Sequence, residues 1–108
     1  MQAYLQLGLV SSKYRLKDNV HYLVGRAPNQ QFFEKLESTV KSVKGVLGVH
    51  DLKAEYVGPN IIQASFHLEV EKGTSLENAD RIAHEVEERA SEEVKCQYSV
   101  IHVDPTND

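Results

Sequence analysis

The sequence is poor in cysteine, in basic residues and in long hydrophobic runs, and each shortage excludes a class of protein. Cys96 is the single cysteine among 108 residues, so no disulfide bond can form within one chain, and a reducing compartment fits this composition. The 12 lysines and arginines are outnumbered by 16 acidic residues, which leaves a net charge of −4. This balance argues against nucleic-acid binding, because that function needs a basic patch to neutralise phosphates.

Long apolar stretches and catalytic motifs are absent as well. No stretch approaches the roughly 18–20 consecutive apolar residues that a membrane-spanning helix needs. The longest mostly apolar stretch, Ala3 to Val10, lacks the basic start and the cleavage site of a signal peptide. We find no glycine-rich phosphate loop, nucleophile elbow or recognisable cysteine–histidine pattern, so the sequence does not predict an enzyme. The length suits one domain with a modest core.

The chain divides into a lead-in segment, residues 1–27, and a domain, residues 28–108. Within the lead-in, residues 14–25 have helical spacing, and the segment is interpreted as a short helix or linker. The first strong helix follows Asn29 as its N-cap and ends at Gly45. Its apolar stripe comprises Phe32 or Phe33, Leu36, Val40 and Val43.

A second helix is predicted after Gly73, with Thr74 and Glu77 as a capping box. Its apolar side is predicted to comprise Leu76, Ala79, Ile82, Ala83, Val86 and Ala90. Three segments have the character of strands. Residues 45–57 lead to a turn at residues 58–60 and pair in a hairpin with residues 61–71, and residues 97–105 form the last strand.

The predicted order is therefore helix, strand, strand, helix, strand. This order indicates an α+β fold in which two helices pack on one face of a three-stranded antiparallel sheet. The arrangement matches a ferredoxin-like two-layer sandwich that lacks its first strand.

Five histidines are many for a chain of this length. In the middle strand, Phe66 and Leu68 must face the helices, so His67 points to the opposite face. The same alternation makes Ile101 and Val103 the core pair of the last strand. The face without helices is thereby predicted to carry His50, His67, His102 and Asp104.

The placement of His50 depends on a regular first strand. Leu47 and Val49 then face the core, and Asp51 points to the face opposite His50. A bulge in this strand would instead turn His50 toward the core.

Three imidazoles and a carboxylate suit Zn²⁺ or a similar divalent ion. Because same-face neighbours are about 6.6–7 Å apart along a strand, His102 and Asp104 could serve one ion, or Asp104 could bridge two. The alternative is that these histidines are merely polar residues on a solvated face.

Elsewhere, His84 is predicted to be solvated and Cys96 to be a small packing residue. Asp80 lies near the border of its helix's apolar stripe and could reach round an edge.

Several stretches resemble the cytoplasmic C-terminal domain of cation diffusion facilitator (cation efflux) transporters, in that family's order and spacing. The similarity extends from about Leu16 to Pro105, and the matching pieces are LVGRAPNQQFFEKL, VKGVLGVHDLKAEYVGPNIIQASFHLEVE, TSLENADRIAHEVEER and VIHVDP.

The resemblance implies a metallochaperone-like fold, a homodimer on the cytoplasmic side of the cell membrane, and Zn²⁺ or related ions at His50, His67, His102 and Asp104. It also implies a transporter with six membrane helices, absent from this sequence, that exchanges metal for protons. Residues 1–13 would then be the stub of, or a replacement for, the last helix. Asp80 stands where some members have a metal-binding histidine early in the second helix, and aspartate is the weaker ligand.

Three functions are compatible with this pattern. The first is a regulatory dimerisation domain in which metal changes the dimer geometry. The second is a structural dimerisation module with incidental histidines, and the third is a free soluble metal carrier. Histidines held on strands favour a fixed site over a carrier, which would need a flexible exposed motif.

Overall fold

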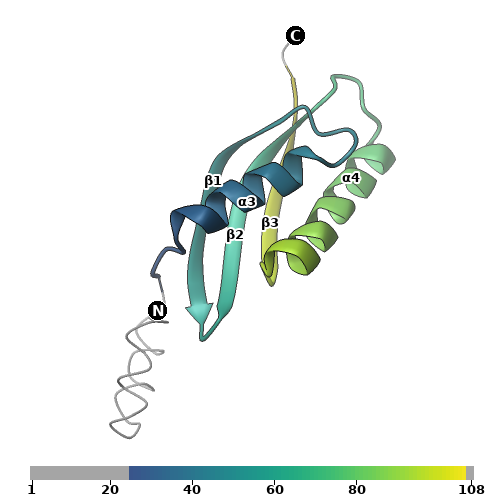
Figure 1. Ribbon diagram of the computed structural model, residues 1–108. Helices are drawn as coiled ribbons and strands as arrows, with labels where there is room; N and C mark the ends of the chain where they lie inside the picture. Colours follow the sequence, from purple (N-terminus) through teal and green to yellow (C-terminus); the bar gives the residue numbers. More distant parts are fainter. Residues whose placement is uncertain (1–24, 107–108) are drawn as a thin grey trace, which may run out of the picture.

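The computed structural model describes residues 25–106 (Figure 1). In chain order, its elements are α3 (Gln30–Lys41), β1 (Gly48–Gly58), β2 (Ile61–Val70), α4 (Leu76–Arg89), the π-helix η1 (Ala90–Val94) and β3 (Tyr98–Pro105). The α+β class and the order helix, strand, strand, helix, strand are confirmed. The predicted lead-in helix, residues 1–13 and His21 lie outside the described residues. Between residues 25 and 106, no helix is long and apolar enough to cross a membrane.

The three strands form one sheet in the order β1-β2-β3, and this sheet is mixed. β1 and β2 are antiparallel and form the predicted hairpin, whereas β2 and β3 are parallel. The prediction of a fully antiparallel sheet was therefore wrong. The physical reason is that α4 carries the chain back to the end at which β2 begins, which is the crossover that parallel neighbours require.

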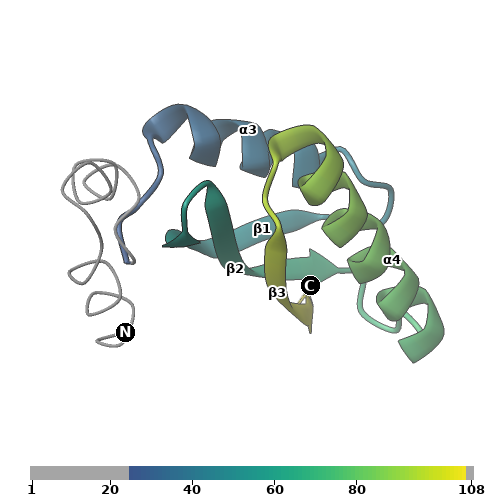
Figure 2. The same cartoon turned by 90° about the horizontal axis from the view of Figure 1, so that it is seen from below.

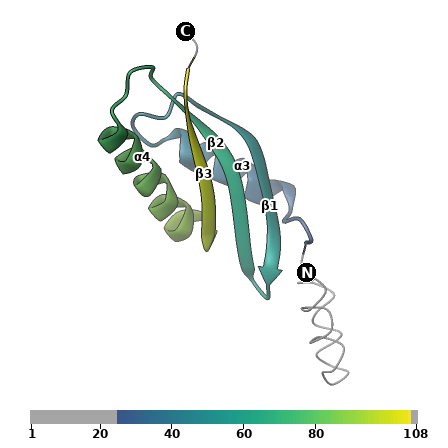
Figure 3. The same cartoon turned by 180° about the vertical axis from the view of Figure 1, so that it is seen from behind.

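Both helices lie on one face of the sheet, and Figure 2 shows this two-layer arrangement from below. The core between the layers follows the predicted alternation of β2, in which every second residue is buried. These buried residues are Ile62, Ala64, Phe66, Leu68 and Val70, and they pack with helix residues that include Leu36, Val40, Ile82 and Val86. The opposite face of the sheet carries no helix of the described chain (Figure 3).

Side-chain caps begin both helices. Asn29 accepts a hydrogen bond from the backbone N–H of Phe32 at 2.9 Å, which confirms the predicted first cap. The second cap is Ser75, whose hydroxyl accepts from the N–H of Asn78 at 3.1 Å. The predicted capping box at Thr74 was one residue early, because the Thr74 hydroxyl donates backward to the carbonyl of Glu71. Leu76 is consequently the first helical residue and is 86% exposed, so it does not join the apolar face.

β1 contains a bulge immediately after His50. His50 pairs with His67 and Lys53 pairs with Ser65, so Asp51 and Leu52 together oppose one residue of β2. Asp51 adopts φ 56 and is exposed, so it does not point to the core. Because the irregularity follows His50, that histidine stays on the open face. Leu47, predicted to face the core, precedes the strand and is 61% exposed.

The segment before α3 is attached to the outer edge of β1. The N–H of Gly25 donates to the carbonyl of Tyr56 at 2.9 Å, and the N–H of Tyr56 donates to the carbonyl of Arg26 at 2.8 Å. Tyr56 lies close to the β1–β2 turn, whereas His50 lies toward the other end of β1. Figure 1 shows that the described chain begins near the β1–β2 turn, and the pairing of His50 with His67 places the histidines toward the other end of the sheet.

Candidate metal site

Three histidines form one row across the open face of the sheet. His50 of β1 pairs with His67 of β2, and His67 pairs with His102 of β3. Their rings stack, with centroids 5.0 Å apart for His50 and His67 and 4.8 Å apart for His67 and His102. Strand register thus brings together three imidazoles that are far apart in the sequence, as the alternation predicted.

Carboxylates occupy the neighbouring row, in which Glu69 pairs with Asp104. The Oδ2 atom of Asp104 lies 2.8 Å from Nδ1 of His67 and 3.7 Å from Nε2 of His50. One donor atom from each of His50, His67 and Asp104 falls in a group with no separation above 4.8 Å. This group is the candidate metal site.

The chemistry of the donors fits a divalent transition metal. Two imidazole nitrogens and a carboxylate oxygen are borderline ligands of the kind that zinc accepts, and water can complete the coordination. The side chains of His50 and Asp104 are each 43% exposed and that of His67 is 33% exposed. An ion could therefore enter from solvent without any movement of the fold.

Two residues predicted as ligands lie outside this group. His102 stacks on His67, but its ring is exposed and its nitrogens are not among the clustered donor atoms. Asp80 is exposed on α4, in the helical layer beneath the sheet, and is not brought to the group. The assignments of His102 and Asp80 as ligands both stay predictions.

His84 and Cys96 lie where their sequence context indicated. His84 is exposed on α4, as predicted. Cys96 is 1% exposed, and its Sγ lies 3.2 Å from the carbonyl oxygen of Tyr98. Burial raises the pKa of the Cys96 thiol. Cys96 is therefore a packing residue of the core, as the sequence suggested.

Glu69 borders the candidate metal site, and the sequence-based prediction did not include it. Its Oε2 lies 3.2 Å from Nδ1 of His50, and its side chain is 42% exposed. The signal was present, because Glu69 shares the parity of His67 two residues along the same strand.

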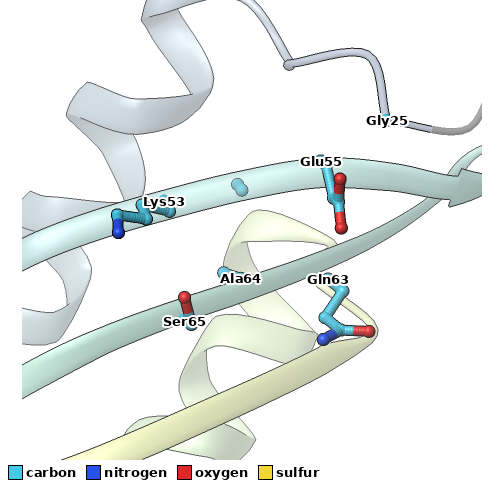
Figure 4. A pocket seen from close by; sticks show the side chains of 7 residues that line it. Gly25, Lys53, Glu55, Gln63, Ala64 and Ser65 are labelled. Atoms are coloured by element: carbon cyan, nitrogen blue, oxygen red, sulfur yellow. The ribbon is translucent and has the colours of Figure 1, made fainter.

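A separate shallow hollow of about 290 Å³ lies nearer the β1–β2 turn (Figure 4). It is lined by Gly25, Lys53, Ala54, Glu55, Gln63, Ala64 and Ser65. No histidine or cysteine contributes to it, so the hollow is distinct from the candidate metal site.

The chain is therefore a two-layer α+β domain whose mixed sheet carries a histidine–carboxylate group on its bare face. Comparison with known protein families shows which family this domain belongs to. Residues 28–106 match the ZT dimer family, described as the cytoplasmic domain of cation efflux proteins. The chain belongs to this family, which confirms the resemblance in the sequence. The family consists of transporter domains and not of enzymes.

Curated relatives are longer than this chain. An uncharacterized transporter, MJ0449, of Methanocaldococcus jannaschii is 40% identical over 86 residues, which cover 80% of this chain and 30% of that protein. The manganese efflux system protein MneS of Bacillus subtilis is 30% identical over 69 residues, covering 64% and 23% of the respective chains. The matched region thus spans less than a third of either relative.

Solved structures of the protein MamM share the fold. A nickel form of a MamM CTD variant has a TM-score of 0.68 and 21% sequence identity, and the match covers 73% of this chain and 100% of that one. A cadmium form of another variant has a TM-score of 0.67 and 22% identity, covering 72% and 96%. At this identity the likeness supports the architecture alone.

Proposed function

We propose that this chain is the cytosolic regulatory and dimerisation domain of a divalent metal cation efflux transporter. In this proposal, zinc binds the open sheet face and shifts the geometry of a homodimer. The observation that carries it is the convergence of donor atoms from His50, His67 and Asp104 within 4.8 Å on a solvent-facing sheet. Family membership supplies the transporter context.

The donor set favours zinc or a similar late transition metal over manganese. Imidazole nitrogens suit Zn²⁺, Ni²⁺ and Cu²⁺, whereas Mn²⁺ prefers carboxylate, carbonyl and water oxygens. The relative MneS is named for manganese efflux. The two histidines of this group nevertheless favour zinc over manganese here, and zinc is commonly held with tetrahedral geometry by three or four such ligands.

His102 is the proposed fourth ligand. Its ring lies 4.8 Å from that of His67, and it is two residues from Asp104 on the same strand. Its side chain is exposed, so a change of rotamer is sterically open to it. A zinc ion held by His50, His67, His102 and Asp104 would have a closed set of four protein ligands.

The proposed partners are a second copy of the chain and the transmembrane domain of the same transporter, on the cytoplasmic side of the cell membrane. A homodimer brings together two chains that each carry a net charge of −4. Each bound Zn²⁺ adds two positive charges, which lowers the repulsion between protomers. Zinc moves the equilibrium only if it binds the closer arrangement more tightly.

Calorimetric titration of the full chain with zinc tests this proposal. His67→Ala and His102→Ala are each expected to weaken binding at least tenfold, or about 1.4 kcal/mol. His84→Ala is the matched control, because it removes an exposed imidazole from the helical layer. Equal affinity in all four proteins would defeat the assignment of His67 and His102 as ligands, and a wild type that binds no zinc would leave the structural dimerisation module.

A further inference from the structure

Glu69 contacts a candidate ligand without belonging to the candidate metal site. Its Oε2 lies 3.2 Å from Nδ1 of His50, whereas Nε2 of the same ring lies 3.7 Å from Oδ2 of Asp104. The two ring nitrogens therefore face different carboxylates. Nε2 faces the Asp104 oxygen that His67 also contacts at 2.8 Å, so Nε2 is the nitrogen directed at the carboxylate shared with His67.

A glycine opposite Glu69 makes room for its carboxylate. Gly48 pairs with Glu69 across the β1–β2 ladder. A Cβ atom added at position 48 would lie 2.9 Å from Oε1 and 3.4 Å from Cδ of Glu69. Gly48 does not have a positive φ, so its backbone does not require glycine. The missing side chain instead leaves the space that Glu69 occupies beside His50.

A histidine that binds a metal through one nitrogen usually donates its other N–H to a carboxylate or carbonyl. That hydrogen bond fixes the tautomer and the orientation of the ring and raises its basicity as a ligand. We propose that Glu69 is the positioning residue of His50: its carboxylate, 3.2 Å from Nδ1, takes up the hydrogen bond from Nδ1–H when a metal ion binds Nε2. This inference rests on the proposed metal binding.

Two other roles for Glu69 make different predictions. A direct ligand would have an oxygen within the convergent group, which comprises His50, His67 and Asp104 without Glu69. A residue that only contributes negative charge would be equivalent to another carboxylate on the same face. Glu55 is such a carboxylate, because it lies on the open face of β1 but in the row of Gln63, away from the histidines.

The first test needs no metal. Two-dimensional ¹⁵N NMR of the imidazole rings, recorded on the full metal-free chain at about pH 8, reports which nitrogen of His50 carries the proton. The wild type is expected to show the Nδ1–H form. Glu69→Ala is expected to lose it, and Glu55→Gln to keep it. If the His50 ring keeps the same tautomer in Glu69→Ala, Glu69 does not fix that tautomer and the positioning role is wrong.

The second test is zinc affinity by calorimetry. Loss of an outer-shell partner typically costs about 10- to 100-fold in metal affinity, so Glu69→Ala is expected to bind at least tenfold more weakly. Glu69→Gln keeps an oxygen that can accept the hydrogen bond from Nδ1–H, so it is expected to lose less zinc affinity than Glu69→Ala. Gly48→Ala, which displaces the carboxylate without removing it, is expected to weaken binding several-fold. Glu55→Gln is expected to stay within twofold of the wild type.

The outcomes separate this inference from the proposed function. If the wild type binds zinc and Glu69→Ala binds it within twofold as tightly, the positioning role is wrong and the metal site stands. If Glu69→Gln and Glu55→Gln lose the same affinity, the effect is bulk charge and the inference fails. If the wild type binds no zinc, the proposed function fails, and the NMR comparison still decides whether Glu69 holds His50.

Discussion

Replacing Asp104 with asparagine should weaken zinc binding while leaving the fold intact. Oδ2 of Asp104 contacts both histidines of the candidate metal site, at 2.8 Å from His67 and 3.7 Å from His50. Asparagine preserves the size of the side chain and one carbonyl oxygen. It removes the negative charge, and a neutral amide oxygen is a much poorer ligand for zinc than a carboxylate.

The size of the effect follows from the exposure of the site. With 43% of the Asp104 side chain exposed, water screens much of its charge, so the dielectric constant of water gives a lower bound on its attraction to an ion. A carboxylate about 2 Å from Zn²⁺ then gains about 4 kcal/mol by Coulomb's law at the dielectric constant of water, and part of this is offset by lost hydration. We expect a loss of roughly 10- to 100-fold in affinity, or about 1.4–2.7 kcal/mol. Without metal, an exposed pair of this kind is worth about 0–1 kcal/mol, so the free energy of unfolding should barely change.

Calorimetric titration and urea unfolding of the same samples separate the two effects. Glu55→Gln is the matched control, because it removes one negative charge from the same sheet face away from the histidines. Wild-type affinity in Asp104→Asn would refute the assignment of this carboxylate as a ligand. An equal loss in Glu55→Gln would show that net charge, and not coordination, governs binding.

Three further predictions concern pH, the thiol and the second helix cap. Zinc affinity should fall as the pH is lowered from about 7.5 to 5.5, because imidazole binds metal only when neutral and histidine ordinarily protonates near pH ~6.5; a titration series with unchanged affinity would contradict histidine ligands. Alkylation of Cys96 at about pH 8 should be slow until urea unfolds the chain, because the thiol is buried and its raised pKa lowers the thiolate fraction; rapid alkylation of the folded protein would show that it is accessible. Ser75→Ala should lower the free energy of unfolding by about 1 kcal/mol, with exposed Ser91→Ala as its control, and equal unfolding midpoints would argue against the cap.

The alternation of β2 was the most informative feature of the sequence. It fixed which face carries Phe66 and which carries His67, because a half-buried strand has a strict period of two. The row of three histidines followed from that alternation once the neighbouring strands were in register. Strand direction did not follow, since the side-chain pattern of β3 is the same whether it runs parallel or antiparallel to β2.

The bulge in β1 is marked in the sequence by a change in the parity of the core-facing residues. Before it, the core-facing residue is odd-numbered Val49, and after it the core-packed residues are even-numbered Leu52, Ala54 and Tyr56. An extra residue is needed to change parity in this way.

The contact of Glu69 with His50 is different in kind, because it depends on the rotamer of Glu69 and on the space left by Gly48. Neither can be obtained from strand period alone.

The central claim, that metal changes how two protomers sit, is tested most directly by a distance between spin labels. Glu88 is exposed on α4, so a spin label can be attached at Glu88→Cys in the full chain, with Cys96→Ala removing the native thiol. Pulsed electron paramagnetic resonance then reports the distance between the α4 helices of the two protomers. The account predicts a homodimer whose label distances shorten and narrow when zinc is added at about pH 7.5, and no such change in a protein that also carries Asp104→Asn. Distance distributions that are the same with and without zinc, in a dimer that binds the ion, would contradict it.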